Sequence, residues 1–155
     1  MQYAIKYRPS YSILEVGLEP GETIRAEAGA MTYMSPNMNV ETHMREKSIL
    51  GTIGLSILGR QSFFVNSYTA QAGSGKVGLV AAPVGDIQQL EVRPGKGYII
   101  QKAAYVASTP DVDLDVKWEG FTRGLFGQGL FMIKVTGNGD LFINTFGAID
   151  KHDLA

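Results

Sequence analysis

Two similar stretches decide the fold of this chain: PGETIRAEAGAMTYMSP at residues 20–36 and PGKGYIIQKAAYVASTP at residues 94–110. When the chain is shifted along itself by 74 residues, the first proline–glycine pair falls on the second, and Pro36 falls on Pro110 without a gap. After each stretch the same series follows: an alternating strand, a glycine-rich loop, an aromatic strand and an exit strand. This shared order predicts an internal duplication of a β unit.

Apolar and polar residues alternate with a period of two along much of the chain, which is typical of half-buried strands. The alternate residues of ILEVGL at 13–18 are expected to point to opposite faces. In NMNVET at 37–42, Met38 and Val40 are expected to face inward. Runs rich in aromatic and β-branched residues predict further strands at 62–70, 76–82, 130–136 and 140–146.

The string GNGD at residues 137–140 separates two of these predicted strands. Glycine and asparagine tolerate the positive φ that tight hairpin turns require. The sequence therefore predicts a hairpin between the strands at 130–136 and 140–146.

We therefore predict an all-β fold in which duplicated antiparallel strands form a double-stranded β-helix or a sandwich-like barrel, because such closure limits open sheet edges. Residues 1–155 are expected to form a single β domain of two tandem units, about 14–90 and 91–155. The second unit stops where a further proline–glycine turn is expected. The chain is interpreted either as naturally short or as lacking a C-terminal part.

Composition narrows the function classes. Lysine and arginine number 14 against 15 aspartates and glutamates, which argues against general nucleic-acid affinity but leaves a local basic patch open. The absence of cysteine excludes disulfides and thiol chemistry. The most apolar stretch, residues 49–59, is too short to span a bilayer as a helix, and the N-terminus has no signal-peptide pattern. We expect a soluble, cytoplasmic protein.

One run of carboxylates is a candidate cation site. Asp111, Asp113 and Asp115 share one face of a predicted strand, and three carboxylates in a row could hold Ca²⁺ or Mg²⁺. A solvated strand face explains the same pattern and is the favoured interpretation, since half-buried strands ordinarily place polar residues outside. Val116 and Thr122 depart from the EF-hand pattern that this run resembles at its start.

The residues needed for catalysis are scarce. The two histidines, His43 and His152, are distant in sequence and cannot supply a metal site of several ligands. No Gly-x-Ser-x-Gly string is present, so a catalytic triad is not expected. We predict that the protein is not an enzyme and binds no cofactor.

Two glycine-rich segments, residues 49–59 and 120–129, carry apolar residues at the expected tips of long hairpins. Apolar loops on a soluble protein suggest an interface, with self-association or shallow membrane insertion as the alternatives to burial under the protein's own strands. The candidate interface residues are Ile53, Leu55, Ile57, Leu58, Phe121, Leu125 and Phe126.

The strings EAGAMTYM, SFFVNSYTA, APVGDI, GF-x(2)-GLFGQGLF and FGAI, in this order, resemble the altered-inheritance-of-mitochondria family over about residues 3–150. The resemblance implies a fold similar to the tryptophan RNA-binding attenuation protein, with strands arranged as a double-stranded β-helix. It implies no enzyme activity, cofactor or catalytic residue. Members usually continue past FGAI into another proline–glycine turn and strand pair. A fungal member is linked to mitochondrial inner-membrane organisation.

The leading functional hypothesis is a homo-oligomeric β protein that acts as a scaffold or binding module. One alternative is a small-molecule or nucleic-acid binding module. Another is a peripheral membrane-associated organising protein. Fold likeness alone does not carry function, and the sequence names no ligand or partner.

Overall fold

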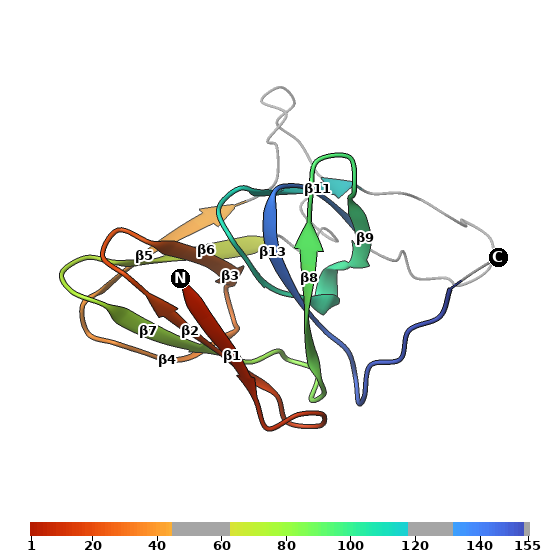
Figure 1. The fold of residues 1–155 in the computed structure, drawn as a ribbon, viewed down its shortest axis with the longest axis horizontal. Helices are drawn as coiled ribbons and strands as arrows, with labels where there is room; N and C mark the ends of the chain where they lie inside the picture. The colour runs from red at the N-terminus through yellow and green to blue at the C-terminus, as the bar shows by residue number, and fades with distance from the viewer. Residues whose placement is uncertain (45–62, 118–131, 154–155) are drawn as a thin grey trace, which may run out of the picture.

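Antiparallel β-strands dominate the computed structural model, which describes residues 1–44, 63–117 and 132–153 (Figure 1). The first seven strands are β1 (Gln2–Lys6), β2 (Ile13–Leu18), β3 (Thr23–Glu27), β4 (Met31–Met34), β5 (Met38–Met44), β6 (Phe64–Ala70) and β7 (Gly75–Leu79). The remaining strands are β8 (Ile87–Val92), β9 (Tyr98–Gln101), β10 (Tyr105–Ser108), β11 (Val112–Lys117), β12 (Met132–Gly137) and β13 (Gly139–Asn144), with one short 3₁₀ turn at Lys102–Ala104.

The strands form three open sheets in the described part of the chain, with the orders β1-β2-β7-β4, β5-β6-β3-β10-β13-β8 and β11-β12-β9. The all-β prediction is confirmed. No sheet closes into a barrel among the described residues, so the architecture is that of stacked sheets. The likeness to a double-stranded β-helix stays a prediction.

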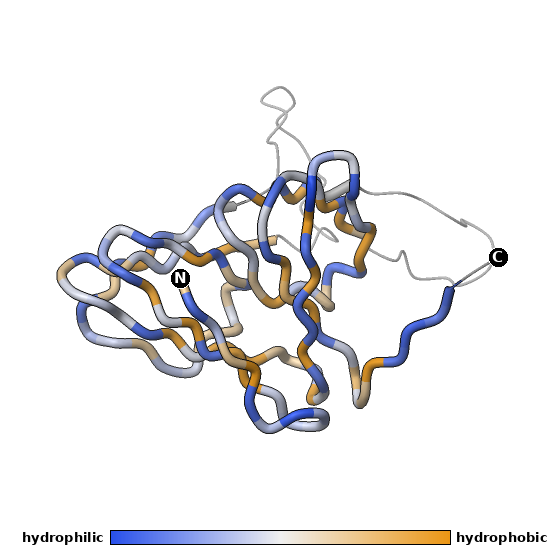
Figure 2. Tube along the Cα trace, viewed as in Figure 1, coloured by the Kyte–Doolittle hydropathy of each residue, from blue (hydrophilic) through white to orange (hydrophobic). Residues whose placement is uncertain are grey.

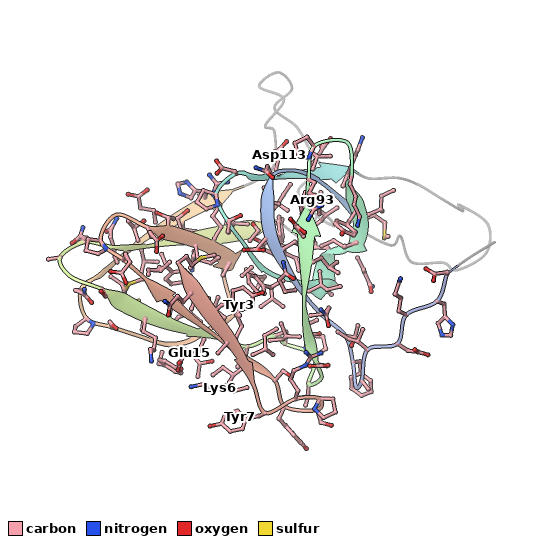
Figure 3. The ribbon with its side chains drawn as sticks, viewed as in Figure 1. Tyr3, Lys6, Tyr7, Glu15, Arg93 and Asp113 are labelled. Carbon is pink, nitrogen blue, oxygen red and sulfur yellow. The ribbon has the colours of Figure 1, made fainter. Side chains whose placement is uncertain are left out.

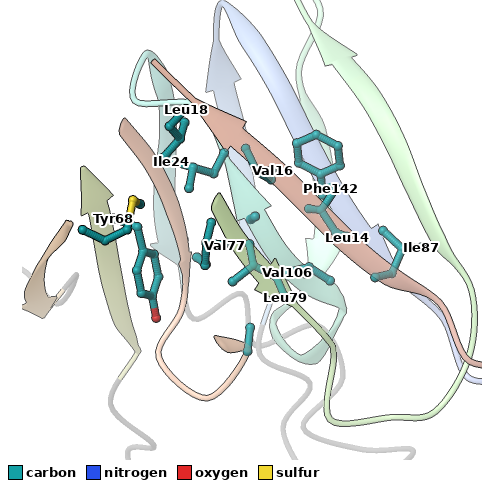
Figure 4. Close-up of a cluster of buried hydrophobic side chains, with 14 of the residues drawn as sticks. Leu14, Val16, Leu18, Ile24, Tyr68, Val77, Leu79, Ile87, Val106 and Phe142 are labelled. Carbon is teal, nitrogen blue, oxygen red and sulfur yellow. The ribbon is translucent and has the colours of Figure 1, made fainter. Parts of the chain in front are cut away.

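Alternation of side chains produces the first core. In β2, Leu14, Val16 and Leu18 are fully buried while the residues between them are half-buried, as the sequence predicts. These side chains pack with Val77 of β7 and Phe142 of β13, so the four-stranded sheet covers one face of the six-stranded sheet (Figure 4). Burial of each large aliphatic side chain contributes roughly 1.5–3 kcal/mol.

A second core lies between the six-stranded and three-stranded sheets. It contains Leu141 of β13, Val92 of β8, and Ile133 and Val135 of β12. Phe63 also lies in it, edge-on to Tyr105 with ring centroids 5.4 Å apart. The strands β10, β13 and β8 therefore serve both cores. In Figure 2 hydrophobic and hydrophilic residues alternate along the strands, whereas residues just before the C-terminus are hydrophilic.

The strand pairings occur twice in the same order. β2-β7-β4 matches β8-β13-β10, and β5-β6-β3 matches β11-β12-β9. The matching also includes an irregularity, because the register shifts between Met31 and Tyr33 in β4 and between Tyr105 and Ala107 in β10. In this repeated order β8 is the counterpart of β2. The two tandem units at about 14–90 and 91–155 stay a prediction.

The hairpin predicted at GNGD is wrong. β12 pairs with β11 and β9, whereas β13 pairs with β10 and β8, so the two strands belong to different sheets. Gly137 and Gly139, with φ values of +112° and +153°, turn the chain from one sheet to the next. Only glycine adopts such values readily. The sequence therefore indicated a turn at these glycines, but it did not show that the flanking strands belong to different sheets.

Two further expectations concern single residues and membrane spans. Met38 is buried, but Val40 is 38% exposed and was wrongly expected to face inward. Val40 lies on β5, an edge strand of the six-stranded sheet, where a side chain is covered from one side only. No helix among the described residues has the length and hydrophobicity to cross a membrane.

Candidate functional site

The outer face of the four-stranded sheet carries a cluster of four polar residues, one from each strand. The Glu15 carboxylate on β2 accepts hydrogen bonds from Lys6 Nζ of β1 at 3.0 Å and Tyr33 Oη of β4 at 2.6 Å. Lys76 Nζ of β7 lies 3.1 Å from the same carboxylate. Glu15 and Lys6 lie near each other below β1 and β2 in Figure 3. We call these residues the Glu15 cluster.

A glycine makes room for the tyrosine of this cluster. Gly78 lies beside Tyr33 in the β4–β7 pairing, and a Cβ atom at Gly78 would lie 2.3 Å from a Tyr33 ring carbon. The ring therefore lies flat over the bare backbone of β7, which directs its hydroxyl to Glu15.

The electrostatics of the cluster are those of a stabilised carboxylate. Hydrogen bonds from Tyr33, Lys6 and Lys76 lower the pKa of the Glu15 carboxyl to about 2. The same bond raises the pKa of the Tyr33 hydroxyl, because the phenol is already donating to a negative charge. A carboxylate with so low a pKa is a poor proton donor or acceptor near neutral pH. The Glu15 cluster joins four strands and does not resemble an acid–base centre.

A second polar centre lies where the N-terminal turn meets the loop before β8. Asp86, whose side chain is 5% exposed, accepts from Arg8 Nε at 2.9 Å and from Arg8 Nη2 at 2.8 Å, one bond on each carboxylate oxygen. Ser12 Oγ and the Ile87 amide each donate to Oδ1 at 2.8 Å. Hydrogen bonding to Arg8 lowers the pKa of Asp86 against the opposing effect of burial.

Backbone contacts complete this centre, which we call the Asp86 junction. Gly85 forms a parallel bridge with Gly147, and the Asp86 amide donates to the Gly147 carbonyl at 2.9 Å. The Ser12 amide donates to the Gly85 carbonyl at 3.1 Å. Three segments far apart in sequence are thus held together, and each carboxylate oxygen of Asp86 already has a donor. The Asp86 junction is therefore built for structure.

The predicted acidic run lies on an exposed strand face. Asp111, Asp113 and Asp115 are exposed and alternate with the buried Val112 and Leu114, where β11 pairs with β12. No group of three or more histidine, cysteine, aspartate or glutamate residues comes close enough to hold a metal ion in the described ranges. The three carboxylates thus share the exposed face of β11, and the solvated-face interpretation stays a prediction.

The seven candidate interface residues cannot be placed. Ile53, Leu55, Ile57 and Leu58 belong to residues 45–62, and Phe121, Leu125 and Phe126 belong to residues 118–131, both of which lie outside the described residues. Exposed apolar side chains are instead described elsewhere. They include Met31, Tyr33 and Met34 on β4 and Ile99 on β9, which are 38%, 40%, 39% and 62% exposed.

Sequence reasoning missed both polar centres. Arg8 and Asp86 are 78 residues apart, and no spacing rule connects them. The one available signal was an aspartate directly before an apolar strand in APVGDI, a string that carried the family resemblance. Glu15 looked like an ordinary polar position of an alternating strand, since its partners come from three other strands.

The model of the family described as mitochondrial biogenesis AIM24 matches residues 3–155 of this chain. The chain belongs to this family. An uncharacterized protein of Streptococcus pyogenes serotype M6 is 28% identical over 161 residues, which cover 99% of this chain and 64% of that relative. A crystal structure of a Streptococcus pyogenes protein, a structural genomics target, matches with a TM-score of 0.71 and 26% identity over 96% of this chain and 66% of that one. The chain thus spans about two thirds of the length of these AIM24 relatives.

Proposed function

We propose that this AIM24 protein is a non-enzymatic, homo-oligomeric scaffold or binding module that acts through its sheet edges and faces. The observation that carries the proposal is β4. This short edge strand of the four-stranded sheet exposes all four of its residues, among them the large apolar Met31 and Met34. An exposed apolar edge is a template for pairing with another chain.

The polar centres support the same proposal. The carboxylates of Glu15 and Asp86 are saturated by donors from neighbouring strands and turns. Neither is poised to transfer a proton, and both hold side chains from neighbouring elements together. A rigid frame with an open edge suits assembly better than chemistry.

Native mass spectrometry of the purified protein at micromolar concentrations tests this proposal. We expect a series of masses at multiples of 16.8 kDa with no added mass. A monomer alone would overturn the oligomeric part of the proposal. A reproducible additional mass on each subunit would favour the small-molecule binding alternative, and identification of that mass would name the ligand class.

The other two alternatives have separate readouts. A nucleic-acid binding module predicts gel-shift affinity that falls steeply with salt, because phosphate contacts release counterions. A membrane-associated organising protein predicts co-sedimentation with anionic vesicles. We expect neither, since acidic and basic residues nearly balance.

A further inference from the structure

The six-stranded sheet is itself built by an edge-to-edge junction between the two repeated sets of strands. Its halves, β5-β6-β3 and β10-β13-β8, meet where β3 pairs antiparallel with β10. In this junction Ala26 lies opposite Ala107, and Arg25 lies opposite Ser108. Arg25 Nη1 also donates to the Pro110 carbonyl at 2.7 Å. The β3–β10 pairing therefore shows how the β5-β6-β3 half-sheet of one unit joins the β10-β13-β8 half-sheet of the next.

The same two kinds of half-sheet occur again with their joining edges open. β11-β12-β9 corresponds to β5-β6-β3, which makes β9 the counterpart of β3. β4-β7-β2 corresponds to β10-β13-β8, which makes β4 the counterpart of β10. Both β9 and β4 are terminal strands of their sheets among the described residues.

The side chains of the paired edge strands are more buried than those of the open edge strands. All four residues of β10 are buried, whereas all four residues of β4, at the matching position, are exposed. In β9, Ile99 is 62% exposed, which is the highest exposure of any large apolar residue within a described strand. The apolar side chains at these edges lack the neighbouring strand that covers their counterparts.

We propose that β4 of one copy of this chain pairs antiparallel with β9 of another copy, repeating between molecules the β3–β10 junction. The proposal rests on the oligomeric function proposed above and names its interface. Transferring the observed register places Tyr33 opposite Ile100 and Met34 opposite Ile99. Two exposed apolar side chains, Met34 and Ile99, then become cross-strand neighbours, an arrangement that stabilises antiparallel sheets.

The geometry of the chain makes this association head-to-tail. β4 lies at the lower left of Figure 1 and β9 at the right, so the two edges are on opposite sides of the molecule. Each copy offers one edge of each kind, which is a heterologous contact that generates rings or open chains of subunits. The joined sheet would have the order β11-β12-β9 followed by β4-β7-β2-β1 of the next copy.

Edge-blocked variants test the pairing by sedimentation velocity over a range of concentrations. We expect Ile99→Lys and Met34→Lys each to reduce the wild-type assembly to monomers, because a charged side chain on an edge strand opposes pairing with another strand. Val40→Lys is the matched control, since Val40 is 38% exposed on an edge strand outside the proposed junction, and it should assemble like the wild type. Circular dichroism verifies that each variant is folded.

Mixing the two blocked variants gives the sharper result. The Ile99→Lys protein retains an intact β4 edge, and the Met34→Lys protein retains an intact β9 edge. An equimolar mixture should therefore form a one-to-one dimer that grows no further. Monomers only, or assemblies larger than a dimer, would overturn the head-to-tail pairing.

The outcomes separate this inference from the proposed function. If the wild type assembles and both lysine variants assemble equally well, the β4–β9 junction is wrong while the oligomeric function stands. If the wild type is monomeric at every concentration, both are wrong. Should both variants misfold, amide hydrogen exchange on the wild type decides. Protection of residues 98–101 must rise with protein concentration, and protection independent of concentration would show that the chain covers this edge itself.

Discussion

Two arginine–carboxylate pairs of the same chemistry lie in different surroundings. Arg8 pairs with Asp86, whose side chain is 5% exposed, whereas Arg93 pairs with Glu91 where both side chains are more than half exposed. The first pair forms two parallel hydrogen bonds and shares its carboxylate with Ser12. The Arg8 pair should therefore matter far more to the stability of the fold.

Replacing each arginine measures that difference. We expect Arg8→Ala to lower the free energy of unfolding by about 2 kcal/mol, because a nearly buried carboxylate loses its counter-charge. Arg93→Ala is the control and should leave the free energy of unfolding nearly unchanged, because water replaces an exposed partner. Urea denaturation followed by circular dichroism reports both values. Equal losses in the two variants would contradict the assigned role of the Asp86 junction.

The Glu15 cluster predicts how the pKa of Glu15 changes when one hydrogen-bond donor is removed. Tyr33→Phe removes the hydroxyl that donates to Glu15 and leaves Lys6 and Lys76 in place. The pKa of Glu15 should rise but remain below its ordinary value, as measured by NMR titration of the carboxyl carbon. Tyr11→Phe, at a 76% exposed tyrosine, is the control. An unchanged Glu15 pKa in Tyr33→Phe would show that the hydroxyl does not donate in solution.

At the scale of elements, matching strand pairs of the two units carry their large side chain on opposite strands of the pair. Tyr33 pairs with Gly78, so a large side chain lies over a bare backbone. At the matching position, Ala107 pairs with Phe142, which is fully buried and packs edge-on against Tyr3. The large residue thus moves from one strand to its partner, and the face that is outside in the first unit is inside the core in the second.

The bridge between the loop before β8 and the segment after β13 depends on close backbone approach. A Cβ atom at Gly85 would lie 1.7 Å from the Thr145 carbonyl oxygen. Gly85→Ala should therefore lower the free energy of unfolding by about 3 kcal/mol, at the upper end of the usual cost of overpacking. Gly17→Ala is the control, because its nearest atom lies 3.9 Å away, and it should change stability by less than about 1 kcal/mol. Chemical denaturation compares the two variants, and equal stabilities would contradict the close approach.

At the scale of the whole molecule, the paired carboxylates predict how stability depends on pH. Hydrogen bonds lower the pKa values of Glu15, Asp86, Glu22 and Glu91 in the folded state. Below their unfolded values of about 4, the unfolded chain binds more protons than the folded one. The stabilisation is therefore complete above about pH 4 and is lost as the pH falls toward 2, where Glu15 itself protonates.

A thermal unfolding series from pH 6 to pH 2 measures this loss. The melting temperature of the wild type should fall mainly below pH 4. The double variant Glu15→Gln, Asp86→Asn should be less stable than the wild type at pH 6 and should approach it near pH 2, because it has fewer carboxylates to protonate. Parallel profiles for the two proteins would contradict the assignment.

Much of the strand content of this protein was predictable, because alternation depends only on neighbouring residues. The strands expected at 62–70, 76–82, 130–136 and 140–146 correspond to β6, β7, β12 and β13. The alternation expected in β2 is also observed, with Leu14, Val16 and Leu18 buried on one face. The apolar face of a strand is buried away from water in any arrangement of the strands. The residue pattern within each strand is therefore enough to predict which face is buried.

The arrangement of those strands was decided by contacts between distant residues. GNGD indicated a turn, but whether the two strands share a sheet depends on β9, β10 and the other partners that they find elsewhere. Likewise, Val40 follows the alternating pattern yet remains exposed, because no strand covers the edge at β5 in the described part of the chain. Glu15 and Asp86 acquire their low pKa values only when donors from other segments fold around them. Hydrogen bonds and burial depend on which residues meet in the folded structure. The order of residues along the chain constrains these contacts only where the partners are close in sequence.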